Sequence, residues 1–499
     1  MTTDPERMPV IVGVGQINDR PADPLEGLDP PALMIAALRR AEEDAGAKLL
    51  GEVDSLAIVD QIGFRALNPL TGAVAAGIGA APRLLVQSPA PHGDTPIRFL
   101  NEAANAIAAG EIRLAAVTGA EALRTAAARA RAAATSYAAI RNAGSIREPT
   151  YAQRHGLAAP VDVYPLYENA ARAAWGQSLE HGQAESAAIW AAMSQVAAND
   201  SSGAWLKRAV SAADVLEVSP ANRLIAFPYS KLMVANSSVN QGAGFIVASL
   251  AEARRRGIAA DKLIHIGAGA AAKEPADILA RDRFDYSVSM ETSIRRTLAL
   301  NGLGADDFEF AELYSCFPCV PKMARRVLGW DAAHPITVFG GLTFGGGPIA
   351  NYMSHAVCAM VERLRPEGQV GGGGRGFLFA NGGFATDNHC IVLAREPVRG
   401  VSLPAGYDYQ AEADAARGAI PALDEDYCGP ATIETYTVFY DREGSPRGGV
   451  VVARTPRGAR TLAAVDPADT ALIAFLTDGS TEPVGTMGTV TGEVRHWQT

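Results

Sequence analysis

A short segment ahead of a predicted helix carries the first residues whose types could do chemistry. It reads Ser88-Pro-Ala-Pro-His-Gly-Asp-Thr-Pro96, in which Thr95 suits the helix N-cap and Pro96 the first helical position. The free N–H groups at such a start, including that of Gly93, can stabilise negative charge on an oxygen atom. His92 could act there as an acid or a base, although an exposed loop histidine is an equally good interpretation.

Two tyrosines follow predicted strands or loops, at the sheet edge where α/β proteins place ligands. Tyr314 begins Tyr314-Ser-Cys-Phe317 after the apolar strand 308–313, and Tyr352 ends Gly345-Gly-Gly-Pro-Ile-Ala-Asn-Tyr352. Two phenols with shifted pKa values could relay a proton. Packed aromatic rings with satisfied hydroxyl groups are the alternative. We expect both tyrosines to face one cavity with Gly93, Gly346 and Gly382.

The cysteines argue against a disulfide framework and against a zinc site. The chain has five of them, an odd and sparse set for 499 residues. Cys316 and Cys319 form a single C-x-x-C pair, whereas a zinc ribbon requires a second pair. The spacing alone is weak evidence for redox chemistry. The sequence therefore predicts reduced thiols and no metal.

Composition and charge narrow the class of protein. Apolar residues make up 48% and charged residues 20% of the chain, which is typical of a soluble protein of two to four domains. The net charge of −10 argues against a nucleic-acid partner. No run of 18 apolar residues occurs, so no membrane span is expected. Met1–Arg7 has no apolar signal core, which favours a cytoplasmic location.

The chain contains an internal repeat. Val10–Gly15 and Ile264–Gly269 both read as a buried strand that runs into a glycine turn. A helical stretch follows each strand, and an Arg-Arg pair precedes the glycine that ends it, Gly46 or Gly302, by six residues. Each copy then enters an apolar strand, at 53–59 and 308–313. Strand–helix–strand order predicts parallel sheets covered by helices.

These patterns predict an α/β fold of two similar halves with an insertion and an added domain. The insertion is alanine-rich and helical, and Pro160, Pro165 and Pro228 interrupt it. After Gly400 the sequence alternates as short strands do, which predicts a small β-barrel. The predicted boundaries are 8–123 and 238–250 for the N-terminal half, 124–237 for the insertion, 251–396 for the C-terminal half and 405–499 for the barrel.

Residues 8–396 resemble the thiolase superfamily, and within it the sterol-carrier-type thiolases and bacterial thiolase-like proteins. Thiolases have two similar five-stranded α/β halves with a helical loop domain inserted in the first, which matches the repeat and the insertion. The C-terminal segment resembles an oligonucleotide/oligosaccharide-binding-type barrel. The resemblance therefore implies a thiolase fold followed by such a barrel.

The same resemblance indicates that the catalytic residues of thiolases are missing. The nucleophilic cysteine corresponds to Gly93, the histidine of a Gly-His-Pro loop to Gly347, and the cysteine of a Cys-x-Gly loop to Ala380. No cysteine precedes residue 316, so another alignment would not supply the nucleophile. Cys316 lies in the second family loop, Tyr314-Ser-Cys-Phe317, whose cysteine the relatives do not use as a nucleophile. A covalent acyl-enzyme is therefore not expected.

The tyrosines resemble those of thiolase-like aldolases, which cleave β-hydroxyacyl-CoA thioesters and also lack the cysteine. Those enzymes carry one tyrosine in a Tyr-Asp-Cys-Phe motif, where this chain has Tyr314 and Ser315, and another that matches Tyr352. His389 ends a segment that resembles a Gly-x-x-Thr-Lys-His motif of the sterol-carrier type. The resemblance implies Tyr314, Tyr352, His389 and His92 as acid–base candidates, and the backbones of Gly93, Gly346, Gly347, Gly382 and Gly383 as oxyanion donors.

The leading functional prediction is carbon–carbon bond chemistry on acyl-CoA without a cysteine, such as retro-aldol cleavage of a β-hydroxyacyl-CoA. A catalytically silent acyl-CoA-binding protein is the runner-up, and a conventional acetyl-CoA acetyltransferase is third. Coenzyme A would be part of the substrate, with no other cofactor, and Arg223 and Lys231 of the insertion are candidates to bind its phosphates. Thiolases usually dimerise, but the barrel could cover that surface, so a homodimer and a monomer are both compatible with the sequence.

Overall fold

Ten strands form the central sheet of the protein. The computed structural model describes residues 4–134, 148–199, 201–365, 374–493 and 495–499. The ten strands are β1 (Pro9–Asn18), β2 (Ser55–Ile58), β3 (Leu84–Gln87), β4 (Leu114–Ala122), β7 (Asn240–Ser249), β8 (Ile264–Ile266), β9 (Ala270–Lys273), β10 (Phe310–Leu313), β11 (Arg375–Gly382) and β12 (Asp387–Ala394). Their order is β10-β11-β12-β8-β1-β7-β4-β2-β3, with β9 also paired to β12.

The two halves repeat the same pairing pattern, as the sequence predicted. In the first half β3, β2 and β4 are parallel, and β7 and β1 follow as antiparallel strands. In the second half β10 and β11 are parallel, and β12 pairs antiparallel with β11 and with both β8 and β9. The predicted parallel strands are present in both halves, but the sheet as a whole is mixed. Residues 383–386 join β11 to β12, and so short a connection can join only antiparallel strands.

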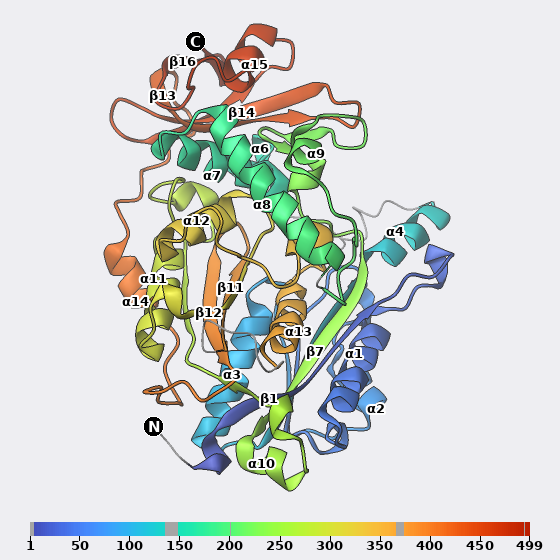
Figure 1. The fold of residues 1–499 in the computed structure, drawn as a ribbon. Coiled ribbons are helices and arrows are strands. Elements are labelled where there is room, and N and C mark those ends of the chain that lie inside the picture. The colour runs from blue at the N-terminus through green and yellow to red at the C-terminus, as the bar shows by residue number, and fades with distance from the viewer. Residues whose placement is uncertain (1–3, 135–147, 200, 366–373, 494) are drawn as a thin grey trace.

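Helices cover the sheet and separate its two halves. They are α1 (Pro30–Ala45), α2 (Thr71–Ile78), α3 (Thr95–Ala109), α10 (Leu250–Arg255), α11 (Val288–Asn301), α12 (Cys319–Leu328) and α13 (Tyr352–Leu364). Helices α1 and α11 end at Gly46 and Gly302, which adopt the left-handed conformation predicted for both. Helices α3 and α13 each contact strands of both halves, and Figure 1 shows α13 between β7 and the β11–β12 pair. Within the described ranges, no helix combines the length and apolarity that a membrane crossing requires.

Between β4 and β7, the residues that the structure describes form five α-helices and two short strands. They are α4 (Leu123–Ala132), α6 (Tyr151–Arg154), α7 (Pro160–Ala174), α8 (Leu179–Asn199), α9 (Ala212–Leu216), β5 (Leu224–Ala226) and β6 (Tyr229–Ser230). A buried ion pair fastens this region to the second half, because Lys322 Nζ of α12 lies 2.5 Å from Glu168 Oε1 of α7. Tyr229 donates a hydrogen bond to the same carboxylate over 2.9 Å.

The C-terminal region forms a closed β-barrel of five strands. They are β13 (Gly429–Tyr440), β14 (Pro446–Arg454), β15 (Arg460–Val465), β16 (Met487–Thr491) and β17 (His496–Gln498), with α15 (Thr470–Thr477) between β15 and β16. The ring closes because β13 pairs with both β14 and β16, and closure leaves no free sheet edge. Figure 1 shows the barrel seated over α6–α9. Strand β5 of the insertion also pairs with β13, and α14 (Gln410–Ala416) packs on α11 of the body.

Candidate functional site

The start of α3 and the end of β10 meet at one point. Helix α3 begins at Thr95, and Asp94 is its N-cap residue, without a side-chain capping bond. The prediction of Thr95 as N-cap was therefore wrong by one residue. The N–H groups of Gly93 and Asp94 have no hydrogen-bond partner among the residues described. Two free donors thus remain at this helix start, where they could bind an oxyanion.

Gly93 has no room for a side chain. A Cβ atom at this position would lie 2.3 Å from the Asn381 carbonyl oxygen and 2.5 Å from the Tyr314 hydroxyl oxygen. Tyr314 is 8% exposed, and its hydroxyl forms no hydrogen bond with any described residue. Burial, with further contributions from Cys316 and Asp94, raises the pKa of Tyr314 well above that of an ordinary phenol. At neutral pH Tyr314 is therefore a protonated donor beside Gly93.

A charged cluster adjoins this point. Asp387, at the start of β12, binds His92 Nδ1 through one carboxylate oxygen at 2.8 Å and Lys273 Nζ through the other at 2.9 Å. The hydrogen bond to Asp387 raises the pKa of His92. Burial raises the pKa of Asp94 to about 6, and the charge of Asp387 adds to this. The cluster therefore offers a carboxyl group with a pKa of about 6 beside an imidazole whose pKa is raised, so both groups have shifted acid–base properties.

Gly382 completes this site. A Cβ atom on Gly382 would lie 3.0 Å from the Gly93 nitrogen and 3.1 Å from Asp94 Oδ1. Gly383 follows with a positive φ of 64°, and its carbonyl oxygen accepts a hydrogen bond from Tyr164 of α7. The structure therefore brings Gly93, Gly382 and Tyr314 together.

Tyr352 lies beside Tyr314, but its hydroxyl turns away from Gly93. The two rings are perpendicular, with centroids 5.7 Å apart. The Tyr352 hydroxyl donates to Glu312 Oε1 over 2.6 Å, and this carboxylate also accepts hydrogen bonds from Thr337, Val338 and Phe339. Burial raises the pKa of Glu312 to about 7. Tyr352 is fully buried, and its hydroxyl is committed to Glu312 and forms no hydrogen bond with Tyr314.

The other predicted donors and bases lie elsewhere. The Gly347 N–H donates to the Asn236 carbonyl oxygen, so it is already used. A side chain on Gly346 would meet Gln241 Oε1. His389 is fully buried, its Nε2 pairs with Asn101 in the second turn of α3, and burial lowers its pKa to about 3. None of these three residues contacts His92 or Tyr314 through a hydrogen bond.

The predicted phosphate ligands lie against the barrel. Arg223 donates to the carbonyl oxygens of Leu224 and Asp441, the latter in the turn after β13. Lys231 is exposed. The guanidinium of Arg223 therefore serves the contact between the insertion and the barrel, and only Lys231 presents its charge to solvent.

The overall likeness to solved structures identifies the chain. An SCP2-thiolase-like protein type 1 from Mycobacterium smegmatis is 31% identical over 99% of both chains, with a TM-score of 0.82. This chain belongs to the SCP2-thiolase-like protein type 1 family. The additional C-terminal domain of thiolase-like protein type 1 matches residues 410–494, which contain most of the barrel.

More distant structures share the thiolase fold with this type 1 thiolase-like protein. An Ltp2-ChsH2(DUF35) aldolase is 18% identical over 78% of this chain and 98% of that chain, with a TM-score of 0.59. The dimeric peroxisomal thiolase of Saccharomyces cerevisiae is 14% identical over 79% of this chain and 99% of that chain, with a TM-score of 0.58. No curated protein sequence matches the chain.

The Cys316 and Cys319 thiols of this type 1 thiolase-like protein are poor nucleophiles. Cys316 and Cys319 are buried. Burial raises the pKa of Cys316 to about 12 and that of Cys319 well above its usual range. Because the thiolate is the nucleophilic form, neither group is activated at neutral pH.

Three side chains of the charged cluster could be considered for a cation. Ligand atoms of His92, Asp94 and Asp387 lie within 4.8 Å of one another. The ammonium group of Lys273 already neutralises Asp387, and a divalent ion would have to displace it against charge repulsion. Lys273 would therefore compete with a cation for the Asp387 carboxylate.

Sequence reasoning missed four side chains of this site. Asp387 and Asp94 stand within segments that had been singled out, so their carboxyl groups were a visible signal. Lys273 of β9 and Tyr164 of α7 come from segments without a motif. Tyr164 donates toward Asn381 and accepts a hydrogen bond from the Ala385 N–H, so the insertion holds the turn beside Gly382.

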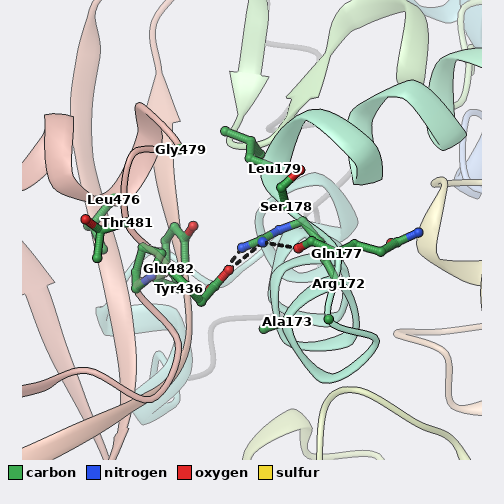
Figure 2. Close-up of a pocket in the computed structure, with 12 residues that line it drawn as sticks. Arg172, Ala173, Gln177, Ser178, Leu179, Tyr436, Leu476, Gly479, Thr481 and Glu482 are labelled. Carbon is green, nitrogen blue, oxygen red and sulfur yellow. Dashed lines mark hydrogen bonds and ion pairs between the residues drawn. The ribbon is translucent and has the colours of Figure 1, made fainter.

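The most prominent pockets lie between the insertion and the barrel, away from Gly93. One of about 690 Å³ is lined by Arg154, Arg447 and Arg495 among others. Another, of about 310 Å³, lies between the α7–α8 turn and the barrel (Figure 2). There Arg172 forms two hydrogen bonds with Glu482, of 2.5 and 3.0 Å, and fastens the barrel to α7.

Proposed function

We propose that this protein performs acid–base chemistry on an acyl-CoA thioester without a covalent intermediate, by retro-aldol cleavage of a β-hydroxyacyl-CoA or by the reverse reaction. The observation that carries the proposal is the position of the Tyr314 hydroxyl against Gly93. A phenol stands where a thiolase would need its nucleophile, and free N–H groups and titratable side chains surround it.

The proposed reaction divides the work among these groups. The β-hydroxyl group loses its proton through the Tyr314 hydroxyl to the Asp94 carboxylate, and the bond between Cα and Cβ breaks. An aldehyde or ketone leaves, and the electron pair moves into the enolate of the shortened thioester. The N–H groups of Gly93 and Asp94 hold the enolate oxygen. Protonated His92 then delivers a proton to Cα, and water is neither consumed nor released.

The structure of a relative supports this choice of reaction class. The Ltp2-ChsH2(DUF35) aldolase shares the fold, and the tyrosine that begins its family's motif corresponds to Tyr314. The Tyr352–Glu312 bond makes Tyr352 a support for Tyr314 in this proposal. We therefore assign the proton relay to Tyr314 and Asp94.

A second candidate, binding of acyl-CoA without turnover, is favoured by the burial of Tyr314. Its hydroxyl fills the space in front of Gly93, so a thioester would have to approach from the side of His92, whose side chain is 46% exposed. A binding protein needs only that approach and the free N–H groups.

One experiment separates the two candidates. The protein is incubated with a panel of β-hydroxyacyl-CoA thioesters, and mass spectrometry detects the shortened acyl-CoA and the carbonyl product, while calorimetry measures binding. Cleavage of any member supports the aldolase proposal. Binding of thioesters without products supports the silent binder, and the absence of both binding and products contradicts both.

We further propose that the protein is a monomer. The similar protein from Mycobacterium smegmatis is described as monomeric. Against this, edge strand β3 exposes Leu84, Leu85 and Val86. Light scattering decides the matter, because the monomer has a mass of 52.1 kDa and a value near twice that mass would overturn the proposal.

A further inference from the structure

An arginine of the barrel reaches into the body of the protein. Arg460 begins β15 and is fully buried. Its Nη1 donates to the carbonyl oxygens of Leu279 and Arg281, each over 2.6 Å. Its Nε and Nη2 bind the Glu434 carboxylate of β13 over 2.8 and 2.6 Å. A guanidinium with this many partners is rigidly held, because its planar fork fixes several hydrogen bonds at once.

Arg281, whose backbone oxygen accepts a hydrogen bond from Arg460, also binds the loop that connects β11 to β12. Arg281 is 2% exposed. Its Nη2 donates hydrogen bonds to the Phe384 carbonyl oxygen and to Thr386 Oγ1, each at a distance of 3.0 Å. The same arginine thus gives its backbone oxygen to the barrel and its side chain to residues 384–386.

This turn lies directly between two parts of the candidate site. Gly382 precedes it and adjoins Gly93, and Asp387 follows it and binds His92. The Thr386 N–H donates to the Gly382 carbonyl oxygen over 2.9 Å. Any movement of residues 384–386 therefore changes the distance from Asp387 to His92.

We propose that the C-terminal barrel positions the candidate site through Arg460, which holds Arg281 and, through it, the 383–386 turn that leads into Asp387, the partner of His92. Arg460 and Arg281 are positioning residues in this scheme, since neither has a hydrogen bond to the site itself. The inference concerns the site described above but does not require that the site turn over a substrate. It gives the barrel a role beyond covering the insertion.

The insertion holds the same turn from another side. Tyr167 of α7 donates to the Phe384 carbonyl oxygen over 2.9 Å, and Tyr164 binds Gly383 and Ala385. Loss of the arginine link therefore loosens the turn without releasing it. We expect amide exchange within residues 383–387 to become about tenfold faster, as in a local opening.

The test compares three variants of the full chain. Arg460→Met removes the Arg460 hydrogen bonds on the barrel side and leaves the Arg454 hydrogen bond to the Asp282 carbonyl oxygen in place. Arg281→Met removes the side-chain link in the body, so the second variant leaves the barrel intact. Arg495→Met is the matched control, because Arg495 lies in the barrel and pairs with Asp426 and the Gly492 carbonyl oxygen, away from the turn.

Two readouts report on the turn itself. Hydrogen exchange measures its amides, and NMR titration measures the pKa of His92, which is assigned by the signal lost in His92→Gln. The groups that face His92 are Asp387, Asp94 and Lys273. In Arg460→Met and Arg281→Met we expect faster exchange and a His92 pKa that falls toward about 6.5, the value of a free imidazole, with no change in Arg495→Met.

Unchanged exchange and an unchanged His92 pKa in a folded Arg460→Met protein would overturn the proposal. If Arg460→Met does not fold, Arg281→Met decides, and wild-type behaviour there also overturns it. Equal effects in the Arg495→Met control would show a general loosening and would count against the link. Neither readout needs a substrate. A failure of this positioning proposal can therefore be distinguished from a failure of the proposed reaction.

Discussion

The hydroxyl of Tyr314 occupies the space that a side chain on residue 93 would need. A Cβ atom on Gly93 would lie 2.5 Å from that oxygen atom and 2.3 Å from the backbone oxygen of Asn381. The backbone oxygen cannot swing aside as a flexible side chain can. Any side chain at residue 93, including that of a cysteine, would therefore require Tyr314 and the Asn381 backbone to shift.

This packing predicts the effect of adding one methyl group. Gly93→Ala should lower the free energy of unfolding by on the order of 1–3 kcal/mol, because overpacking forces the surroundings to shift. Gly72→Ala in α2 is the control: its new Cβ would meet nothing within 4 Å, and it should stabilise the helix by up to about 1 kcal/mol. Denaturant unfolding measures both, and equal stability of the two variants would contradict the packing argument.

Thiolysis should be absent. Gly93 supplies no nucleophile, and burial keeps Cys316 protonated with a pKa of about 12. The protein is incubated with acetoacetyl-CoA and free coenzyme A, and acetyl-CoA formation is followed. Turnover in the enzymatic range of roughly 1–1000 per second, or an acyl group trapped on a cysteine, would refute this prediction.

The two tyrosines should respond differently to loss of their hydroxyl groups. Tyr314→Phe should lower cleavage roughly 10²–10⁴-fold, as loss of a positioned acid or base does, with little effect on stability because its hydroxyl has no hydrogen-bond partner among the described residues. Tyr352→Phe should instead cost about 1–3 kcal/mol of stability, since it removes a donor from the buried Glu312 carboxylate. Thermal unfolding and turnover are measured on both, and a reversed pattern would exchange their roles.

Cleavage should have a bell-shaped dependence on pH. Asp94 must be ionised to accept a proton, so kcat/KM should fall below about pH 6, where this carboxyl group gains a proton. His92 must be protonated to donate, and its pKa is raised by Asp387, so activity should fall again above that raised value. Asp387→Asn should move the alkaline limb to lower pH. An alkaline limb that does not move would remove His92 from the mechanism.

The buried ion pair between Lys322 and Glu168 should matter for stability. Lys322→Met leaves an uncompensated carboxylate in the core and should cost about 3–5 kcal/mol. Lys262→Met is the matched control, because Lys262 pairs with Asp44 at 3.1 Å but is 40% exposed, and such pairs contribute about 1 kcal/mol or less. Chemical denaturation compares them, and similar losses in both variants would contradict a special role for the buried pair.

The sequence by itself determined the two α/β halves and the existence of the barrel. The helix ends at Gly46 and Gly302 could be predicted, because the left-handed conformation at a helix C-terminus favours glycine. The barrel strands were readable because side chains alternate between core and solvent along each strand. The glycine at residue 93 is known from the sequence alone, because a residue's identity does not depend on the structure. These features depend on local sequence, which periodicity and residue type report directly.

Only the tertiary structure decided which polar groups meet. Asp387, Lys273 and His92 come from three distant segments, and no spacing along the chain predicts their contact. The hydroxyl of Tyr352 points to Glu312 because that buried carboxylate needs hydrogen-bond donors. The residues near Tyr352 in the sequence do not indicate this contact. Arg460 enters the body only because the barrel docks there. Burial pattern is a local property of a chain, whereas hydrogen-bond partners are chosen among whatever groups the fold brings within about 3 Å.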